Sequence, residues 1–237
     1  MDTTGYVALT RQSGLLQELQ VLANNIANAS TTGFRGEMIH FSEFVSAKGG
    51  GDSSVSMATA RARNMTDKQG GLIQTNGTFD LAIEGDGFFQ VETANGPRLT
   101  RAGAFTPDAN GMLVTHDGLP VLDSGGAPVL VPNQLGPIGI SADGTVTAGD
   151  NLVGQIGLFR PLDPQNMRRV GATMFDPGGA VEPVDNPRMQ QGYLEGANVD
   201  AISQISRMIE VQRAYELGQS FMDKEDERIR SVLQATR

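Results

Sequence analysis

Two stretches in which apolar residues recur at helical spacing lie at opposite ends of this 237-residue chain. The first predicts a helix over residues 4–28, with an apolar stripe formed by Leu15, Leu19, Leu22 and Ile26. Toward the other end, Asp200 is a suitable N-cap for a helix that continues close to Thr236. Because neither helix has a core of its own, we expect the two to pair with each other and with other copies.

The apolar face predicted for the second helix combines two neighbouring lines of side chains. One line holds Ile202, Ile205 and Ile209, and the adjacent line holds Met208, Val211 and Tyr215. At a rise of about 1.5 Å per residue, this helix would be roughly 50 Å long, which is more than a compact domain of this size needs.

Between the two helices, residues 70–185 consist of short apolar runs separated by turn pairs such as Asn110-Gly111, Asp117-Gly118 and Asp143-Gly144. This spacing is typical of hairpins and predicts a central all-β region. The chain holds 30 Gly and 11 Pro but no Trp, which suits a turn-rich β body better than a packed helical enzyme. Residues 46–56, rich in Gly and Ser, have the composition of a flexible connector.

The predicted fold class is therefore α+β, in which long N- and C-terminal helices pair as a coiled-coil-like assembly domain beside a central all-β domain. We expect four segments along the chain. They are residues 1–35 as the N-terminal helix of the assembly domain, 36–75 as an extended connector, 76–185 as the central β domain, and 186–237 as the C-terminal segment and long helix.

Composition disfavours most catalytic chemistry. The absence of Cys excludes disulfides, thiolate zinc sites and cysteine nucleophiles, and His40 and His116 lie far apart in the sequence. We therefore expect no catalytic, cofactor-binding or metal-binding residues and no small-molecule substrate. The net charge of −9 resides mostly in the middle of the chain, whereas nucleic-acid binding needs a basic face, so nucleic acid is not an expected partner.

One enzymatic alternative stays open, a carbohydrate-acting enzyme, because a glycosidase needs two carboxylates that flank a cleft. Candidate pairs are Glu84 with Asp86, and Asp163 with Asp176, although the lack of Trp leaves few rings to form a sugar platform. No run of about 18 apolar residues predicts a membrane span, and the first residues lack the basic and apolar regions of a secretory signal. We expect no membrane insertion and export without a cleaved signal.

Three asparagines, Asn24, Asn25 and Asn28, lie near the end of the first predicted helix. Asn is a poor interior helix former because its amide competes for backbone hydrogen bonds. We interpret these amides as hydrogen-bonding groups for neighbouring chains in an assembly. The alternative is a frayed helix end before the turn at Gly33.

Motifs spread along most of the chain resemble those of the bacterial flagellar rod and hook axial proteins. Residues 21–35 resemble the family's N-terminal signature, and residues 79–89 and 99–105 are similar to the first strands of its β domain. Residues 192–200 and 208–216 resemble its C-terminal motifs, with Ala197 where the family usually has Ser. The start of the chain and its length are most similar to the proximal-rod members, with distal-rod members as the alternative.

The resemblance implies a structural subunit of the flagellar basal-body rod in the periplasmic space. Its expected partners are other copies, other rod proteins and the flagellar type III export apparatus. Such a subunit would assemble helically through its terminal helices and transmit torque in flagellum-dependent motility. The residues expected at the subunit interface are Leu15, Leu19, Leu22, Asn24, Asn25, Ile26 and Asn28 on the first helix, and Ile202, Ile205, Met208, Ile209, Gln212, Arg213 and Tyr215 on the second.

Overall fold

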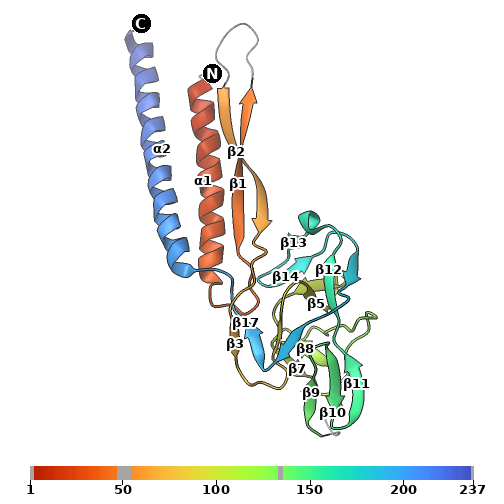
Figure 1. The fold of residues 1–237 in the computed structure, drawn as a ribbon. Helices are drawn as coiled ribbons and strands as arrows, with labels where there is room; N and C mark the ends of the chain where they lie inside the picture. The colour runs from red at the N-terminus through yellow and green to blue at the C-terminus, as the bar shows by residue number, and fades with distance from the viewer. Residues whose placement is uncertain (1–2, 47–54, 133–135, 236–237) are drawn as a thin grey trace. The chain divides into compact units, whose positions relative to one another are not determined.

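The structure, a computed structural model, describes residues 3–46, 55–132 and 136–235 (Figure 1). It contains two long helices, α1 (Thr3–Ala27) and α2 (Ala201–Ala235), with strands between them, so the α+β class is confirmed. The chain divides into two compact units. Unit 1 comprises Met1–Ala29, Gly36–Thr66 and Val199–Arg237, and unit 2 comprises Ser30–Arg35 and Asp67–Asn198.

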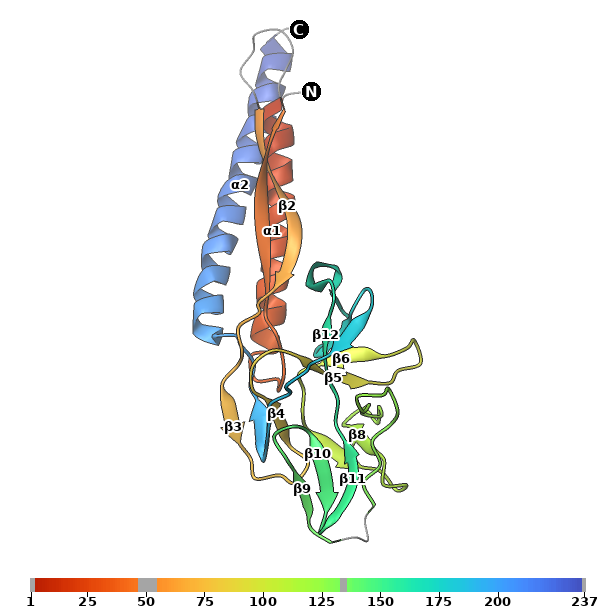
Figure 2. The same ribbon diagram turned by 45° about the vertical axis from the view of Figure 1, so that its right-hand side comes forward.

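In unit 1 the two helices lie side by side, and a hairpin lies along α1 (Figures 1 and 2). The helices begin and end close to their predicted limits. As predicted, Asp200 caps α2, because its carboxylate accepts hydrogen bonds from the backbone N–H groups of Ile202 and Ser203, both at 3.3 Å. The hairpin consists of β1 (Glu37–Ser46) and β2 (Val55–Met65), paired antiparallel with a register shift between His40 and Phe41.

The hairpin differs from the extended connector expected over residues 36–75. The backbone there is extended, but it pairs with itself instead of linking two domains as a single strand. Residues 38–45 contain Ile39, Phe41, Phe44 and Val45, residue types that are enriched in strands, and this composition could have indicated β1. Residues 47–54 of the predicted flexible segment lie outside the described residues.

Unit 2 contains a six-stranded antiparallel sheet in the order β13-β14-β6-β5-β12-β15. Its strands are β13 (Arg168–Arg169), β14 (Met174–Asp176), β6 (Arg98–Thr100), β5 (Phe88–Val91), β12 (Leu158–Pro161) and β15 (Val181–Pro183). A three-stranded sheet is formed by β11 (Asn151–Gln155), β10 (Thr145–Ala148) and β9 (Ile138–Ile140), and β7 (Phe105–Pro107) pairs with β8 (Leu113–Thr115). One 3₁₀ turn, η1 (Pro164–Asn166), precedes β13.

Two further strand pairs join the beginning of unit 2 to its end. They are β3 (Leu72–Gln74) with β17 (Tyr193–Glu195), and β4 (Leu81–Ile83) with β16 (Met189–Gln191). The predicted turn pairs are present as turns, because Gly111, Gly118 and Gly144 all have the positive φ that glycine adopts readily.

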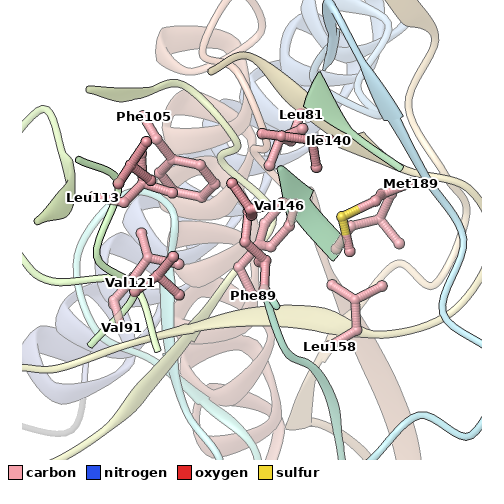
Figure 3. Packing of buried hydrophobic residues seen from close by; sticks show 14 residues of the cluster. Leu81, Phe89, Val91, Phe105, Leu113, Val121, Ile140, Val146, Leu158 and Met189 are labelled. Atoms are coloured by element: carbon pink, nitrogen blue, oxygen red, sulfur yellow. The ribbon is translucent and has the colours of Figure 1, made fainter. Parts of the chain in front are cut away.

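The hydrophobic core of unit 2 is shown in Figure 3. Phe89 packs edge-on against Phe105 with ring centroids 5.1 Å apart. Side chains from the two larger sheets, from the β4–β16 and β7–β8 pairs and from the segment between β8 and β9 complete the cluster. It consists of Leu81, Ile83, Phe89, Val91, Phe105, Leu113, Val121, Val129, Val131, Ile140, Val146, Ile156, Leu158 and Met189.

Candidate assembly site

Polar contacts fix the direction of the helix pair in unit 1. Gln12 Nε2 donates a hydrogen bond of 2.9 Å to the backbone oxygen of Tyr215, and Asn25 Nδ2 donates one of 3.0 Å to Gln204 Oε1. Since the residue earlier in α1 contacts the residue later in α2, the two helices run antiparallel.

An ion pair supports the same arrangement. Arg207 Nη2 lies 2.8 Å from Glu18 Oε1, and Arg207 Nε also donates to this oxygen. The hydrogen bond to Glu18 raises the pKa of Arg207 above its ordinary value. The Arg207 side chain is half exposed, so this pair contributes less than a buried one would.

Covered side chains follow one line on each helix, in steps that alternate between three and four residues. On α1 the line contains Gln12, Leu15, Leu19, Leu22 and Ile26, all buried or half-buried. On α2 it contains Gln204, Met208, Val211, Tyr215, Gly218 and Met222, also buried or half-buried. At an average spacing of 3.5 residues, the same line of side chains on each helix can face the other helix over many turns.

A glycine makes room for the buried amide in the middle of this contact. Gln12 is 5% exposed, and a Cβ atom on Gly218 would lie 2.6 Å from its Nε2 atom. A larger residue at this position of α2 would therefore displace the Gln12 side chain.

Only one of the two predicted apolar lines of α2 is covered within the chain. Ile202, Ile205 and Ile209 are 76%, 46% and 46% exposed, whereas Val211 is 2% exposed. The isoleucines lie about a third of a turn around the helix from the covered line, because successive helical residues are about 100° apart. Gln212 and Arg213 are exposed as well.

The predicted role of one asparagine is wrong. Asn25 is 3% exposed and its amide is used inside the chain, because Oδ1 accepts from Glu37 N at 3.0 Å and Nδ2 donates to Glu37 O at 2.8 Å. It ties α1 to β1 and does not reach a surface open to another chain. Asn28 is half-buried and donates to the backbone oxygen of Asn24 at 2.9 Å, while the Asn24 side chain is exposed.

The outward face of α1 carries no charge. Successive turns of the helix expose only apolar, small or uncharged polar side chains on this face, namely Leu9, Ser13, Leu16, Gln17, Gln20, Ala23, Asn24 and Ala27. A helix face in contact with water normally carries charged residues. This face and the isoleucine line of α2 are two surfaces of the helix pair that no other part of unit 1 covers among the described residues.

Unit 2 contains a buried ionic cluster that the sequence analysis missed. Arg101 Nη1 lies 2.9 Å from Glu195 Oε2, and Arg35 Nη2 lies 3.6 Å from Glu195 Oε1. All three side chains are at most 4% exposed. Burial lowers the pKa of Arg101, and the positive charge of Arg35 lowers it further, while Glu195 opposes both effects.

Backbone groups complete the cluster. Glu195 Oε1 accepts from Gly70 N at 3.1 Å, and Arg101 Nη2 donates to Gly85 O at 2.7 Å. The Phe88 ring lies within 5.8 Å of the Arg35 guanidinium and 5.2 Å of the Arg101 guanidinium. The cluster brings together one residue from each of three motifs recognised in the sequence, residues 21–35, 99–105 and 192–200.

Among the described residues, no helix is both long and apolar enough to cross a bilayer. In the same part of the chain, no three acidic or histidine side chains gather as a metal ion would require.

Comparison with known proteins assigns the chain to a family. Residues 6–35 match a family described as "Flagella basal body rod protein", residues 82–148 match "Flagellar hook protein FlgE/F/G D1 domain", and residues 190–235 match "Flagellar basal body rod FlgEFG protein C-terminal". The flagellar basal-body rod protein FlgF of Caulobacter vibrioides is 42% identical over 99% of this chain and 98% of its own length. The chain belongs to the flagellar basal-body rod protein family.

Other relatives agree with this assignment. FlgF of Mesorhizobium japonicum is 40% identical over 91% of this chain and 90% of its own length. FlgG of Bacillus subtilis is 29% identical over 98% of both chains. The chain is therefore a FlgF-like structural subunit of the flagellar basal-body rod, and its family is a structural one.

Proposed function

We propose that this protein is a subunit of the proximal rod that assembles helically through the free faces of α1 and α2. In this proposal α1 and α2 form a coiled-coil-like pair within each subunit, and the outward face of α1 meets the isoleucine line of a neighbouring subunit. The neighbours are other copies and other rod proteins. The assembled rod crosses the periplasm and transmits torque.

The observation that carries the proposal is the exposure of three isoleucines in a line on a helix that is already paired. Exposed apolar residues that occur singly need no explanation, but a line of them on a rigid element is typical of an interaction surface. The uncharged outward face of α1 supplies a matching partner, because apolar and amide groups can be buried there without removing a charge from water.

Contacts between two different faces of the same subunit produce rings or open helical arrays, whereas contacts between identical faces produce closed dimers. The outward face of α1 and the isoleucine line lie on different helices. This supports a helical rod more than a closed dimer.

A substitution in the isoleucine line tests the proposal. Ile205→Glu should leave the chain folded, because Ile205 is 46% exposed, but should prevent its incorporation into basal bodies, since burying an unpaired carboxylate is costly. Leu152→Glu is the matched control, at a residue 73% exposed in unit 2. Purified basal bodies with a normal content of the Ile205→Glu protein would disprove the proposed interface.

We further propose that the chain is delivered by the flagellar type III apparatus without cleavage of a signal and has no catalytic activity. Two of the four acidic residues considered for a glycosidase, Asp163 and Asp176, are engaged in structural contacts. The carboxylate of Asp163 accepts a hydrogen bond from Gln165 N at the start of η1, and Asp176 Oδ2 lies 3.4 Å from Arg98 Nη2. An open hollow of about 590 Å³ is lined by Ala142, Asp143, Gln155, Asp185, Asn186, Pro187 and Arg188, which offer no aromatic ring to a sugar.

A further inference from the structure

The covered lines of α1 and α2 repeat with a spacing of seven residues, so their apolar contacts are compatible with more than one register. If α2 moved along α1 by seven residues, Val211 would take the place of Gln204, and Tyr215 the place of Met208. Leucines of α1 would still face the covered line of α2, because a seven-residue step returns to nearly the same side of the helix. The apolar residues therefore do not fix a single register by themselves.

Gln12 meets α2 at the one place where that helix has a Gly. Its Nε2 atom donates to Tyr215 O at 2.9 Å, and a Cβ atom on Gly218 would lie 2.6 Å from Nε2. Gly218 is the only Gly in the sequence of α2, although Gly in a helix interior lowers stability relative to Ala. After a slip of seven residues, the side chain of Val211 or Glu225 would occupy the place of Gly218 and displace Gln12.

Glu18 and Asn25 meet α2 at two further levels. Arg207 Nε donates to Glu18 Oε1 at 2.8 Å, and Asn25 Nδ2 donates to Gln204 Oε1 at 3.0 Å. The Glu18 side chain is 12% exposed, so it depends on the cation opposite it. Both contacts form in one register only.

A slip in either direction breaks these contacts together. In one direction Glu18 would face Ala214 and Asn25 would face Val211, neither of which has a polar side chain. In the other direction Glu18 would face the carboxylate of Asp200, a like charge, and Asn25 would face residue 197, before the start of α2. Because buried polar groups that lose their partners are costly, the observed register is favoured over both neighbours.

The same polar groups are not the best choice for stability. Among the residues that the structure describes, Gln12 Oε1 and Glu18 Oε2 are buried and accept no hydrogen bond. Apolar residues at these two positions would leave no buried acceptor without a donor. A polar residue that lies in an apolar line and costs stability is a feature that fixes register in coiled coils.

We propose that Gln12, Glu18 and Asn25 set the register of the α1–α2 pair, and that Gly218 admits Gln12 to it. The three polar residues are positioning residues in this role. If the subunits assemble as proposed above, a single register gives the outward face of α1 and the isoleucine line of α2 the same offset along the pair in every copy, as a regular helical array needs. That consequence rests on the proposed function, whereas the register itself does not.

The register can be measured in the isolated chain by electron paramagnetic resonance, because the chain has no Cys and spin labels attach only where Cys is introduced. Labels at Gln17→Cys on α1 and Gln219→Cys on α2 occupy exposed positions. Dilution with unlabelled protein restricts the measurement to distances within one chain. A slip of seven residues moves one label past the other by about 10 Å. Since no assembly is involved, the outcome is independent of the test with Ile205→Glu.

We expect a single distance in the labelled parent. In Gln12→Leu/Glu18→Leu, in which both positions are apolar, a second distance should account for about 10% of the molecules or more. A single distance equal to the parent's in this variant would overturn the proposal.

Ser13→Leu/Gln20→Leu is the matched control, because it also replaces two polar residues of α1 by Leu, at exposed positions outside the covered line. It should keep the single distance of the parent. A second distance in the control would mean that added leucines, and not the lost polar contacts, permit the slip, and the proposal would fail.

A charge exchange separates register from stability. Glu18→Arg places a second cation opposite Arg207 and should produce the second distance, whereas Glu18→Arg with Arg207→Glu restores an ion pair in the parent register and should restore the single distance. A second distance that persists in the exchanged pair would contradict the role of Glu18. If Gln12→Leu/Glu18→Leu does not fold, the charge exchange decides.

Discussion

At the scale of single residues, the buried cluster has an uneven charge, with two guanidinium groups for one carboxylate. Glu195 is therefore the residue whose loss leaves most charge uncompensated, since Arg35 and Arg101 would then lie near each other with no carboxylate between them. Breaking a buried ion pair typically lowers the free energy of unfolding by about 3–5 kcal/mol. We expect Glu195→Gln to fall in this range.

The same reasoning predicts a partial rescue. In the Glu195→Gln background, Arg35→Met should raise the free energy of unfolding, because it removes one of two like charges, whereas Arg35→Met alone should lower it. Urea unfolding of the four proteins measures both effects as a double-mutant cycle. Two destabilisations that simply add would show that the two guanidinium groups do not repel each other through the cluster.

The asparagines near the end of α1 give a second prediction at this scale. Asn25→Ala should lower the free energy of unfolding by about 1–3 kcal/mol, because the two part-buried hydrogen bonds between the Asn25 amide and the backbone of Glu37 would be lost. Asn24→Ala should leave the isolated chain as stable or slightly more stable, since Ala is the better helix former. Thermal unfolding of both variants measures these two changes in stability. Equal losses of stability in Asn25→Ala and Asn24→Ala would contradict the prediction.

In assembled rods, Asn24→Ala should have a larger effect than it has in the isolated chain. If Asn24 hydrogen-bonds to a neighbouring subunit, Asn24→Ala will reduce the number of complete basal bodies although it leaves the isolated chain stable. Normal numbers of basal bodies would show that this amide faces water.

At the scale of elements, the start of α2 depends on an ionised carboxylate. The Ser203 hydroxyl, and after it the backbone N–H groups, hold the pKa of Asp200 below its ordinary value of 3.8. A carboxylate with a lowered pKa in the folded state stabilises the fold above its unfolded pKa and loses that contribution as the pH falls through the folded pKa. The first turn of α2 should therefore fray below about pH 4.

NMR chemical shifts of Ile202 and Ser203 report this fraying. Asp200→Asn is the matched variant, because Asn is an equally good N-cap but does not titrate in this range. We expect the acid-induced shift changes to vanish in this variant. The same titration in both proteins would show that another group is responsible.

Sequence reasoning predicted the elements whose pattern is local and missed the features that depend on distant partners. The limits of α1 and α2, the Asp200 cap and the turns at Gly111 and Gly118 all follow from neighbouring residues. Periodicity could not decide which apolar line of α2 meets α1, because both lines have helical spacing. Two contacts distinguish the covered line. Gln12 packs against Gly218, and Asn25 donates a hydrogen bond to Gln204.

The ionic cluster could not be predicted in this way. Arg35, Arg101 and Glu195 come from three separate parts of the chain, and nothing in their local sequences indicates burial. The hairpin of β1 and β2 was missed for a different reason, since its two strands flank a Gly-rich segment whose composition favours a connector.

At the scale of the whole molecule, the net charge of −9 opposes association of copies. Contacts through the uncharged outward face of α1 and the isoleucine line of α2 must overcome this repulsion, which salt screens over about 10 Å at 0.1 M. We expect the fraction of oligomers to rise when NaCl increases from about 0.05 to 0.5 M, as measured by analytical ultracentrifugation. Association that weakens with salt would indicate that ion pairs hold the copies together.

The pairing of β3 with β17 and of β4 with β16 also affects the order in which parts of unit 2 can fold. The strands that close unit 2, and the carboxylate of Glu195 with them, come after almost all of the other strands in the sequence. Contacts between such distant segments form slowly, because a long loop must close before any of them contributes energy. A chain that emerges from a narrow channel with its N-terminus first would thus stay open until residue 195 had passed through, and would fold only where it had been delivered.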